Sequence, residues 1–132
     1  MREKVSGILY KQESYEVLGA CFEVYKRLGT GYLESVYQEA LEVEFRLRNV
    51  PFVPQATLQI EYRGMPLRHT FVADFLCFNE IILEIKAMRS LADEHRAQVI
   101  NYLKVTGKQL GLLINFGHYP RIEHERFINE RK

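Results

Sequence analysis

The sequence has few of the residues that mark several large classes of protein. Its 132 residues include only two cysteines, Cys21 and Cys77, without the spacing of a disulfide framework or a zinc site. We expect both to be buried, reduced thiols in the cytoplasm. No apolar run is long enough to cross a membrane, and no signal-peptide pattern opens the chain. The formal net charge is only +1, which argues against a chain-wide attraction for polyanions and leaves a local basic patch open.

Several catalytic motifs are missing as well. The four histidines show no HxxxH or HxH spacing, which argues against a zinc enzyme. The glycines at residues 29–31 are followed by no Lys-Ser/Thr, so they do not form a phosphate loop, and no nucleophilic Ser or Cys motif is present. No repeat, low-complexity tract or linker divides the chain. We therefore expect residues 1–132 to form one domain.

Two apolar runs joined by a short polar turn dominate the middle of the chain. They occupy residues 69–78 and 81–87, and Asn79-Glu80 between them is compatible with a tight turn. The runs are apolar at consecutive positions, which is typical of strands that are covered on both faces. The pattern predicts a buried β-hairpin.

Three charged residues interrupt these apolar runs: Asp74, Glu84 and Lys86. Residues two apart on a strand share a face, so Glu84 and Lys86 project together, and hairpin pairing allows Asp74 to lie beside them. Two neighbouring buried carboxylates repel each other, and a divalent cation would relieve that repulsion. A structural ion pair would explain the same residues, so both interpretations stay open.

Helical periodicity surrounds this hairpin. Residues 13–28 and 33–48 predict two helices before it, and residues 93–105 predict a third after it. The second helix has a wide apolar arc: Leu33, Val36, Tyr37, Ala40, Leu41, Val43, Phe45 and Leu47. Glu34 lies at the edge of that arc in the first turn, where it either complements the helix dipole or points into a pocket shared with Asp74 and Glu84.

The third predicted helix has two stripes. Ala97, Ile100 and Leu103 form an apolar stripe that we expect to sit on the sheet. A polar and aromatic stripe recurs at spacings of four, three and four: Leu91, His95, Gln98 and Tyr102. That second stripe is either a solvated flank or part of a functional site. Further strands are expected at residues 57–62, 109–116 and 122–128.

Residues 31–37 (Gly31-Tyr32-Leu33-Glu34-Ser35-Val36-Tyr37) spell GxxExxY, and three further motifs follow in order. These are YQEAL at residues 37–41, D…ExK formed by Asp74, Glu84 and Lys86, and QxxNYLK at residues 98–104. Over residues 13–127 the chain resembles the GxxExxY protein family, a branch of the PD-(D/E)xK nuclease superfamily. Ala73 stands where the proline that names the superfamily would be.

The resemblance implies an α/β (α+β) fold with a restriction-endonuclease-like core, a mixed β-sheet flanked by helices. The predicted order is α-α-β-β-β-α-β-β, and it contains the α-β-β-β-α-β core of the superfamily. The resemblance also implies that Asp74, Glu84 and the backbone carbonyl of Ile85 hold Mg²⁺ or Mn²⁺. Glu34 would join them through water or hold a second ion.

Two functions follow. In a metal-dependent nuclease acting on DNA or RNA, Lys86 would orient or help to deprotonate the attacking water, and Gln98 would position water or phosphate. Tyr102, His95 and Arg89 are candidate substrate contacts, although His95 equally suits a structural hydrogen bond and Arg89 a solvated surface charge. The alternative is an inactive nuclease-fold module that binds nucleic acid or a protein. In either case a homodimer or a partner protein could supply substrate choice.

Overall fold

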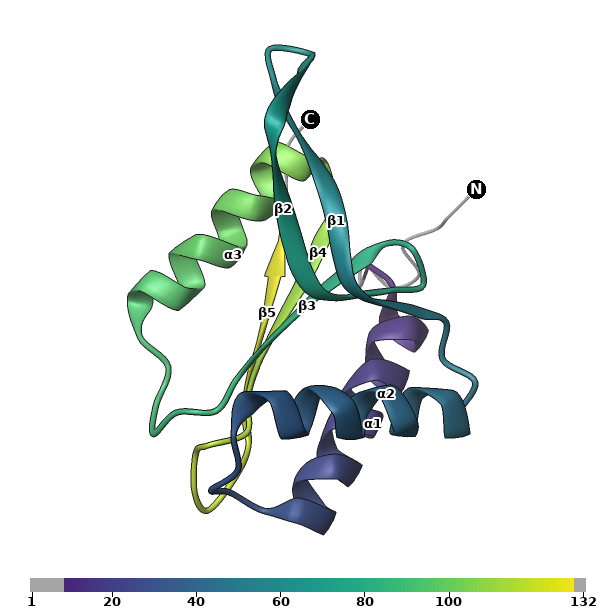
Figure 1. Cartoon of the computed structure of the whole chain (residues 1–132), viewed down its shortest axis with the longest axis vertical. Coiled ribbons are helices and arrows are strands. Elements are labelled where there is room, and N and C mark those ends of the chain that lie inside the picture. Colours follow the sequence, from purple (N-terminus) through teal and green to yellow (C-terminus); the bar gives the residue numbers. More distant parts are fainter. Residues whose placement is uncertain (1–8, 130–132) are drawn as a thin grey trace.

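The structure, a computed structural model, describes residues 9–129. The order of helices and strands predicted from the sequence is confirmed (Figure 1). The elements are α1 (Lys11–Leu28), α2 (Glu34–Leu47), β1 (Phe52–Tyr62), β2 (Met65–Cys77), β3 (Ile81–Lys86), α3 (Asp93–Thr106), β4 (Leu110–Asn115) and β5 (Glu123–Ile128). None of the helices described is long and apolar enough to pass through a bilayer.

The strands form one mixed sheet in the order β1-β2-β3-β4-β5. β3 and β4 are parallel and are joined through α3, whereas the other neighbouring pairs are antiparallel. A parallel pair needs such a crossover because its ends lie at opposite edges of the sheet. The mixed sheet with flanking helices is the restriction-endonuclease-like α+β fold that the sequence predicts.

Two hydrophobic cores cover the two faces of the sheet. Ile81, Leu83 and Ile85 of β3 belong to the larger core under α1 and α2. Ile82, between them on the strand, belongs to the smaller core under α3. This is the period-2 alternation of a strand that is buried on both sides. It explains why β3 reads as a nearly continuous apolar run.

The helices bury narrower apolar faces than their sequences predicted. Of the apolar arc of α2, only Tyr37, Leu41 and Phe45 are buried, and Leu33, Val36, Val43 and Leu47 are exposed. On α3 the expected stripe is wrong at two of three positions, because Ala97 and Ile100 are exposed. Val99 takes their place and packs with Leu103 against the sheet. A wide or weak apolar pattern does not specify which part of it meets the sheet.

β1 and β2 continue beyond the body of the protein as a two-stranded ribbon, at the top of Figure 1. We call residues 57–72 the arm. At its tip, Tyr62 pairs with Met65 across Arg63 and Gly64, whose φ angles are 52° and 81°. Positive φ at both central residues is the mark of a type I′ turn, which suits the twist of a two-stranded ribbon. Every residue from 61 to 70 is exposed.

Candidate functional site

The candidate site lies where β2 separates from β3. The ladder between these strands pairs Cys77 with Ile81, Leu76 with Ile82 and Phe75 with Leu83, and no further pair follows. The next residues on the two strands are Asp74 and Glu84.

At this fork the carboxylates replace the backbone acceptors of the ladder. The Asp74 N–H donates to Oε2 of Glu84 at 3.0 Å, and the Ile85 N–H donates to Oδ2 of Asp74 at 2.9 Å. The structure therefore brings the two acidic residues of the predicted site together, each bound to the backbone of the neighbouring strand.

Asp74 also marks a slip in the alternation of β2. Phe71 and Ala73 belong to the core under α3, whereas Phe75 and Cys77 belong to the core under α1 and α2. Side chains two apart on a regular strand share a face, so the strand must twist or kink between Ala73 and Phe75. Asp74 lies at that point, half-buried and outside both cores.

Two glutamines that sequence reasoning missed hold Asp74 in place. Gln55 lies opposite the kink, in the left-handed region with φ of 47°, and its side chain hydrogen-bonds the carboxylate of Asp74. From α2, Nε2 of Gln38 donates to the backbone oxygen of Asp74 at 3.2 Å. Gln38 belongs to the YQEAL motif, but the motif did not indicate this contact, and Gln55 has no sequence signal. Both contacts depend on how distant elements pack.

The carboxylates of the site carry more negative charge than their surroundings neutralise. Burial, and after it the charge of Asp74, raise the pKa of Glu84 to about 8 against the opposing effects of the Asp74 N–H and Lys86. Burial also raises the pKa of Asp74, although the Ile85 N–H and Lys86 partly offset it. A third carboxyl, that of Glu34, has its pKa raised by burial and by Asp74. Three acids thus share the charge of one lysine.

Glu34 joins this group from the first turn of α2. The backbone N–H of Ala87, directly after β3, donates a hydrogen bond to its carboxylate. The charge of Asp74 raises the pKa of Glu34 and that of Lys86 lowers it, so both groups lie near it. Glu34 is thus an acid in a first turn that is exposed overall, with its carboxylate at the end of β3. A pocket shared with Asp74 and Glu84 stays a prediction.

The remaining predicted residues lie on α3 or just before it. Nδ1 of His95 accepts the Ala92 N–H at 3.0 Å, which is a structural hydrogen bond at the start of the helix. Gln98 is exposed, and its Nε2 donates to the Tyr102 hydroxyl at 3.2 Å. The Tyr102 ring stacks on Phe71 of β2, with ring centroids 3.5 Å apart. Arg89 is exposed in the connection between β3 and α3.

A buried polar network, also missed, fixes that connection. Oδ1 of Asn115 accepts the N–H groups of Met88 and Gly117, both at 3.0 Å. Nδ2 of Asn115 donates to Oε1 of Glu123 at 2.8 Å, and the same oxygen accepts the Leu91 N–H at 3.0 Å. Because the network holds both ends of residues 88–91, it sets how α3 stands relative to Lys86.

In residues 9–129, no three Asp, Glu, His or Cys side chains gather closely enough to hold a metal ion. The available ligands at the fork are two carboxylates and a backbone carbonyl. Lys86 O accepts the N–H of Phe116, directly after β4, whereas the Ile85 N–H donates to Asp74. Backbone groups alternate in direction along a strand, so the Ile85 carbonyl also faces the side of Asp74.

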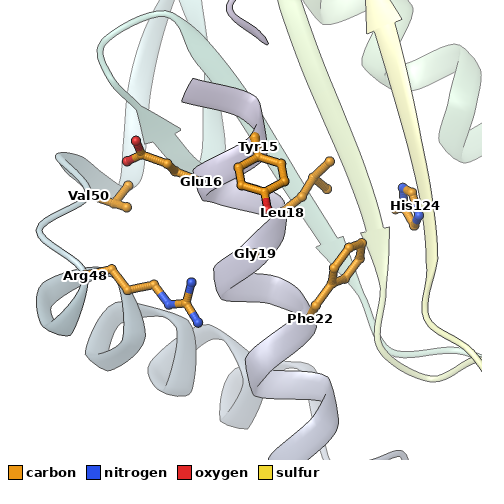
Figure 2. Close-up of a pocket in the computed structure, with 8 residues that line it drawn as sticks. All are labelled: Tyr15, Glu16, Leu18, Gly19, Phe22, Arg48, Val50 and His124. Carbon is orange, nitrogen blue, oxygen red and sulfur yellow. The ribbon is translucent and has the colours of Figure 1, made fainter. Parts of the chain in front are cut away.

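A hollow that shares no residue with the fork lies on the outer side of α1. It has a volume of about 670 Å³ and is lined by α1, the residues after α2, and His124 of β5 (Figure 2). It contains none of the residues predicted for the site. Its size alone therefore gives no reason to move the chemistry there.

Comparison with known proteins agrees with the fold. The family model of the PD-(D/E)XK nuclease superfamily matches residues 11–127, and the chain belongs to that superfamily. No curated protein sequence matches it significantly. Among solved structures it is similar to the crystal structure of SSO0001, with a TM-score of 0.59 and 21% identity. The match covers 93% of this chain and 62% of that one, so this chain spans less than two thirds of its length.

Proposed function

We propose that the protein is a metal-dependent nuclease of the GxxExxY family that hydrolyses phosphodiester bonds in nucleic acid. The observation that carries the proposal is the fork, where Asp74 and Glu84 exchange hydrogen bonds with each other's strands. A purely structural ion pair would match each acid with a base. Here three acids share one lysine and the pKa of each acid is raised, so the site lacks the positive charge that three carboxylates need.

The ligands at the fork suit a hard divalent cation. Mg²⁺ commonly binds through one or two carboxylates and keeps several waters, so a cluster of three acidic side chains is not required. Asp74, Glu84 and the Ile85 carbonyl would hold Mg²⁺ or Mn²⁺, and Glu34 would contribute through water. When bound, the cation supplies positive charge to the phosphate and acidifies a water molecule.

The protein's own residues would complete the reaction. Lys86 shares the pleat face of Glu84, so its Nζ would orient or help to deprotonate the attacking water and would offset charge on the phosphate. Gln98 would position water or phosphate once its amide leaves Tyr102. Tyr102, His95 and Arg89 would contact the nucleic acid on the side of α3, with His95 also keeping its hydrogen bond to Ala92.

The wider setting is part of the same proposal. Residues 1–132 would act as one nuclease domain in the cytoplasm, with DNA or RNA as partner. The chain spans 62% of the solved chain it resembles, which is compatible with a further domain, a partner protein or a second copy supplying substrate choice.

The test combines metal binding with cleavage. Calorimetry with Mg²⁺ and Mn²⁺ should show binding by the wild type and its loss in Asp74→Ala and Glu84→Ala. Cleavage of single- and double-stranded DNA and RNA should fall about 10²–10³-fold or more in both variants and in Lys86→Ala, which keeps the metal ligands.

Arg121→Ala is the matched control, since it removes an exposed base from the β4–β5 connection without touching the fork. Metal binding without cleavage of any polymer would instead support an inactive module that binds nucleic acid or a protein. Absence of metal binding would refute the enzyme.

A further inference from the structure

The arm has a shape that the core of the protein does not require. Its two strands pair Thr57 with Val72 and Gln59 with Thr70, and the ribbon then extends past the covering helices (Figure 1). Only its base is covered, where Phe71, Leu58 and Ile60 pack under α3. Residues 61–70 are exposed throughout, so the outer half of the arm contributes little to the hydrophobic stability of the fold.

The arm carries arginines that lack acidic partners. In the described part of the chain, Arg27, Arg46, Arg48 and Arg96 each lie within 4 Å of a carboxylate. Arg63 at the tip and Arg68 on β2 take part in no ion pair there, and Glu61 is the single acid among residues 57–72. Unpaired arginines on a projecting ribbon suit phosphate oxygens, which they bind through two parallel hydrogen bonds.

The face of the arm that points away from α3 is mostly polar. Leu58 and Phe71 face α3, so the alternate residues Thr57, Gln59 and Thr70 lie on the opposite face together with the exposed Val72. Arg68 is exposed where the pairing of the two strands is irregular, between the pairs Gln59–Thr70 and Glu61–Pro66. Hydroxyl, amide and guanidinium groups are those that hydrogen-bond to the edges of bases, and the major groove of B-DNA admits a two-stranded β-ribbon.

From these features we infer that the arm lies in the major groove of a DNA duplex whose backbone is at the fork. This rests on the proposed function and narrows its substrate to double-stranded DNA, since the deep, narrow major groove of A-form RNA does not admit a ribbon. Arg63 and Arg68 bind phosphates, and the polar face meets the bases.

The arm also sets a length for the substrate. β1 gives the better measure because β2 has extra residues where the pairing shifts. Tyr62 at the tip is seven residues from Gln55, which lies opposite Asp74, or about 23 Å at roughly 3.3 Å per residue. Arg68 lies opposite Ile60, about five residues or about 16 Å away. At about 3.4 Å per base pair, the arm reaches roughly 5 to 7 base pairs to one side of the scissile phosphate.

Binding tests this inference directly. Full-length Glu84→Gln protein in Mg²⁺ buffer would be titrated with a fluorescent 24-base-pair DNA duplex, its single strand and the RNA duplex of the same sequence. Adding Arg63→Ala and Arg68→Ala should weaken binding to the DNA duplex by at least about fivefold. It should also reduce the slope of log affinity against log salt concentration by the amount expected for about two phosphate contacts. Adding Arg121→Ala, which removes another exposed arginine without an ion pair, should leave both values unchanged.

Substrate length gives a second readout, in wild-type protein. Shortening the duplex on one side of the cleavage site should reduce cleavage in steps at about 7 and about 5 base pairs, and the double arm variant should not show these steps. Circular dichroism and melting temperature would confirm that each variant folds.

Each outcome separates the arm from the nuclease. Arm-dependent binding of the DNA duplex without cleavage would support the arm and refute the nuclease. If the wild type cleaves DNA and the arm variants bind it as Arg121→Ala does, the role of the arm is refuted and the nuclease proposal stands. An equal loss of binding to single strands or to duplex RNA would also refute insertion into the major groove.

Discussion

The two ends of β2 have opposite surroundings. From Phe75 to Cys77 the strand is buried on both faces, whereas from Met65 to Thr70 it is exposed on both. Both ends contain apolar residues, so hydropathy alone does not separate them. What differs is coverage, because helices lie over one end and only solvent surrounds the other. Asp74 lies between the two, where a charged group is close to water and still rests against a rigid core.

The sharpest test of this contrast is a pair of truncations on one strand. Phe75→Ala removes a fully buried ring that contacts Phe45 and Phe52, and it should lower the free energy of unfolding by about 3–5 kcal/mol. Leu67→Ala, at a side chain that is 41% exposed on the arm, should change it by about 0.5 kcal/mol or less. Urea denaturation of both variants measures the difference. Similar losses would mean that the arm is packed in solution.

At the fork, which lies between the two ends of β2, a carboxylate needed for the proposed function should lower the free energy of unfolding. Burial raises the pKa of Glu84 to about 8 from its ordinary 4.5, so the folded protein holds that proton more tightly than the unfolded chain. The contribution of this group to stability is therefore greatest below the unfolded pKa and is lost as pH rises from about 4.5 to about 8. Glu84→Gln keeps an acceptor for the Asp74 N–H but cannot ionise. Without metal, it should be more stable than the wild type at pH 8 by on the order of 2 kcal/mol.

Thermal melts in EDTA at pH 5 and pH 8 measure this effect. The variant and the wild type should melt alike at pH 5 and differ at pH 8. Addition of Mg²⁺ at pH 8 should stabilise the wild type alone, since the variant has lost a ligand. If the wild type is instead the more stable of the two at pH 8 in EDTA, then surrounding groups fully offset the cost of burying the ionised Glu84 carboxylate.

Much of the fold was predictable because the signals are local. Buried β3 shows as an apolar run, and Glu84 and Lys86 stand out within it because charges are rare in such runs. Hairpin pairing allowed Asp74 to lie beside Glu84, and the structure brings the two together. The turn itself is one residue longer than Asn79-Glu80, because Cys77 rather than Phe78 pairs with Ile81, and this extra residue sets the register that places Asp74 opposite Glu84.

The rest of the site depends on contacts between distant segments. The left-handed Gln55 and the slip at Asp74 arise where two cores meet, and no single stretch of sequence encodes that meeting. Asn115 ends a strand that reads as continuous core, and its role is visible only beside Met88 and Glu123. On α3, Val99 rather than Ala97 faces the sheet because the crossover fixes the rotation of the helix.

The smallest expected effect concerns the contact that ties the arm to the body. Tyr102 of α3 stacks on Phe71 at the base of the arm, and such a pair contributes about 0.5–1.5 kcal/mol beyond the area it buries. Tyr102→Leu should therefore speed hydrogen exchange at the arm amides by up to about tenfold while β3 and β4 stay protected. Tyr102→Phe keeps the ring and loses only the hydrogen bond from Gln98, so it should exchange like the wild type. If the phenylalanine variant loosens the arm as much as leucine does, then the hydroxyl rather than the stacked ring holds the arm to α3. The arm would then be coupled to Gln98, and a change in that amide's partner during catalysis would also release the ribbon.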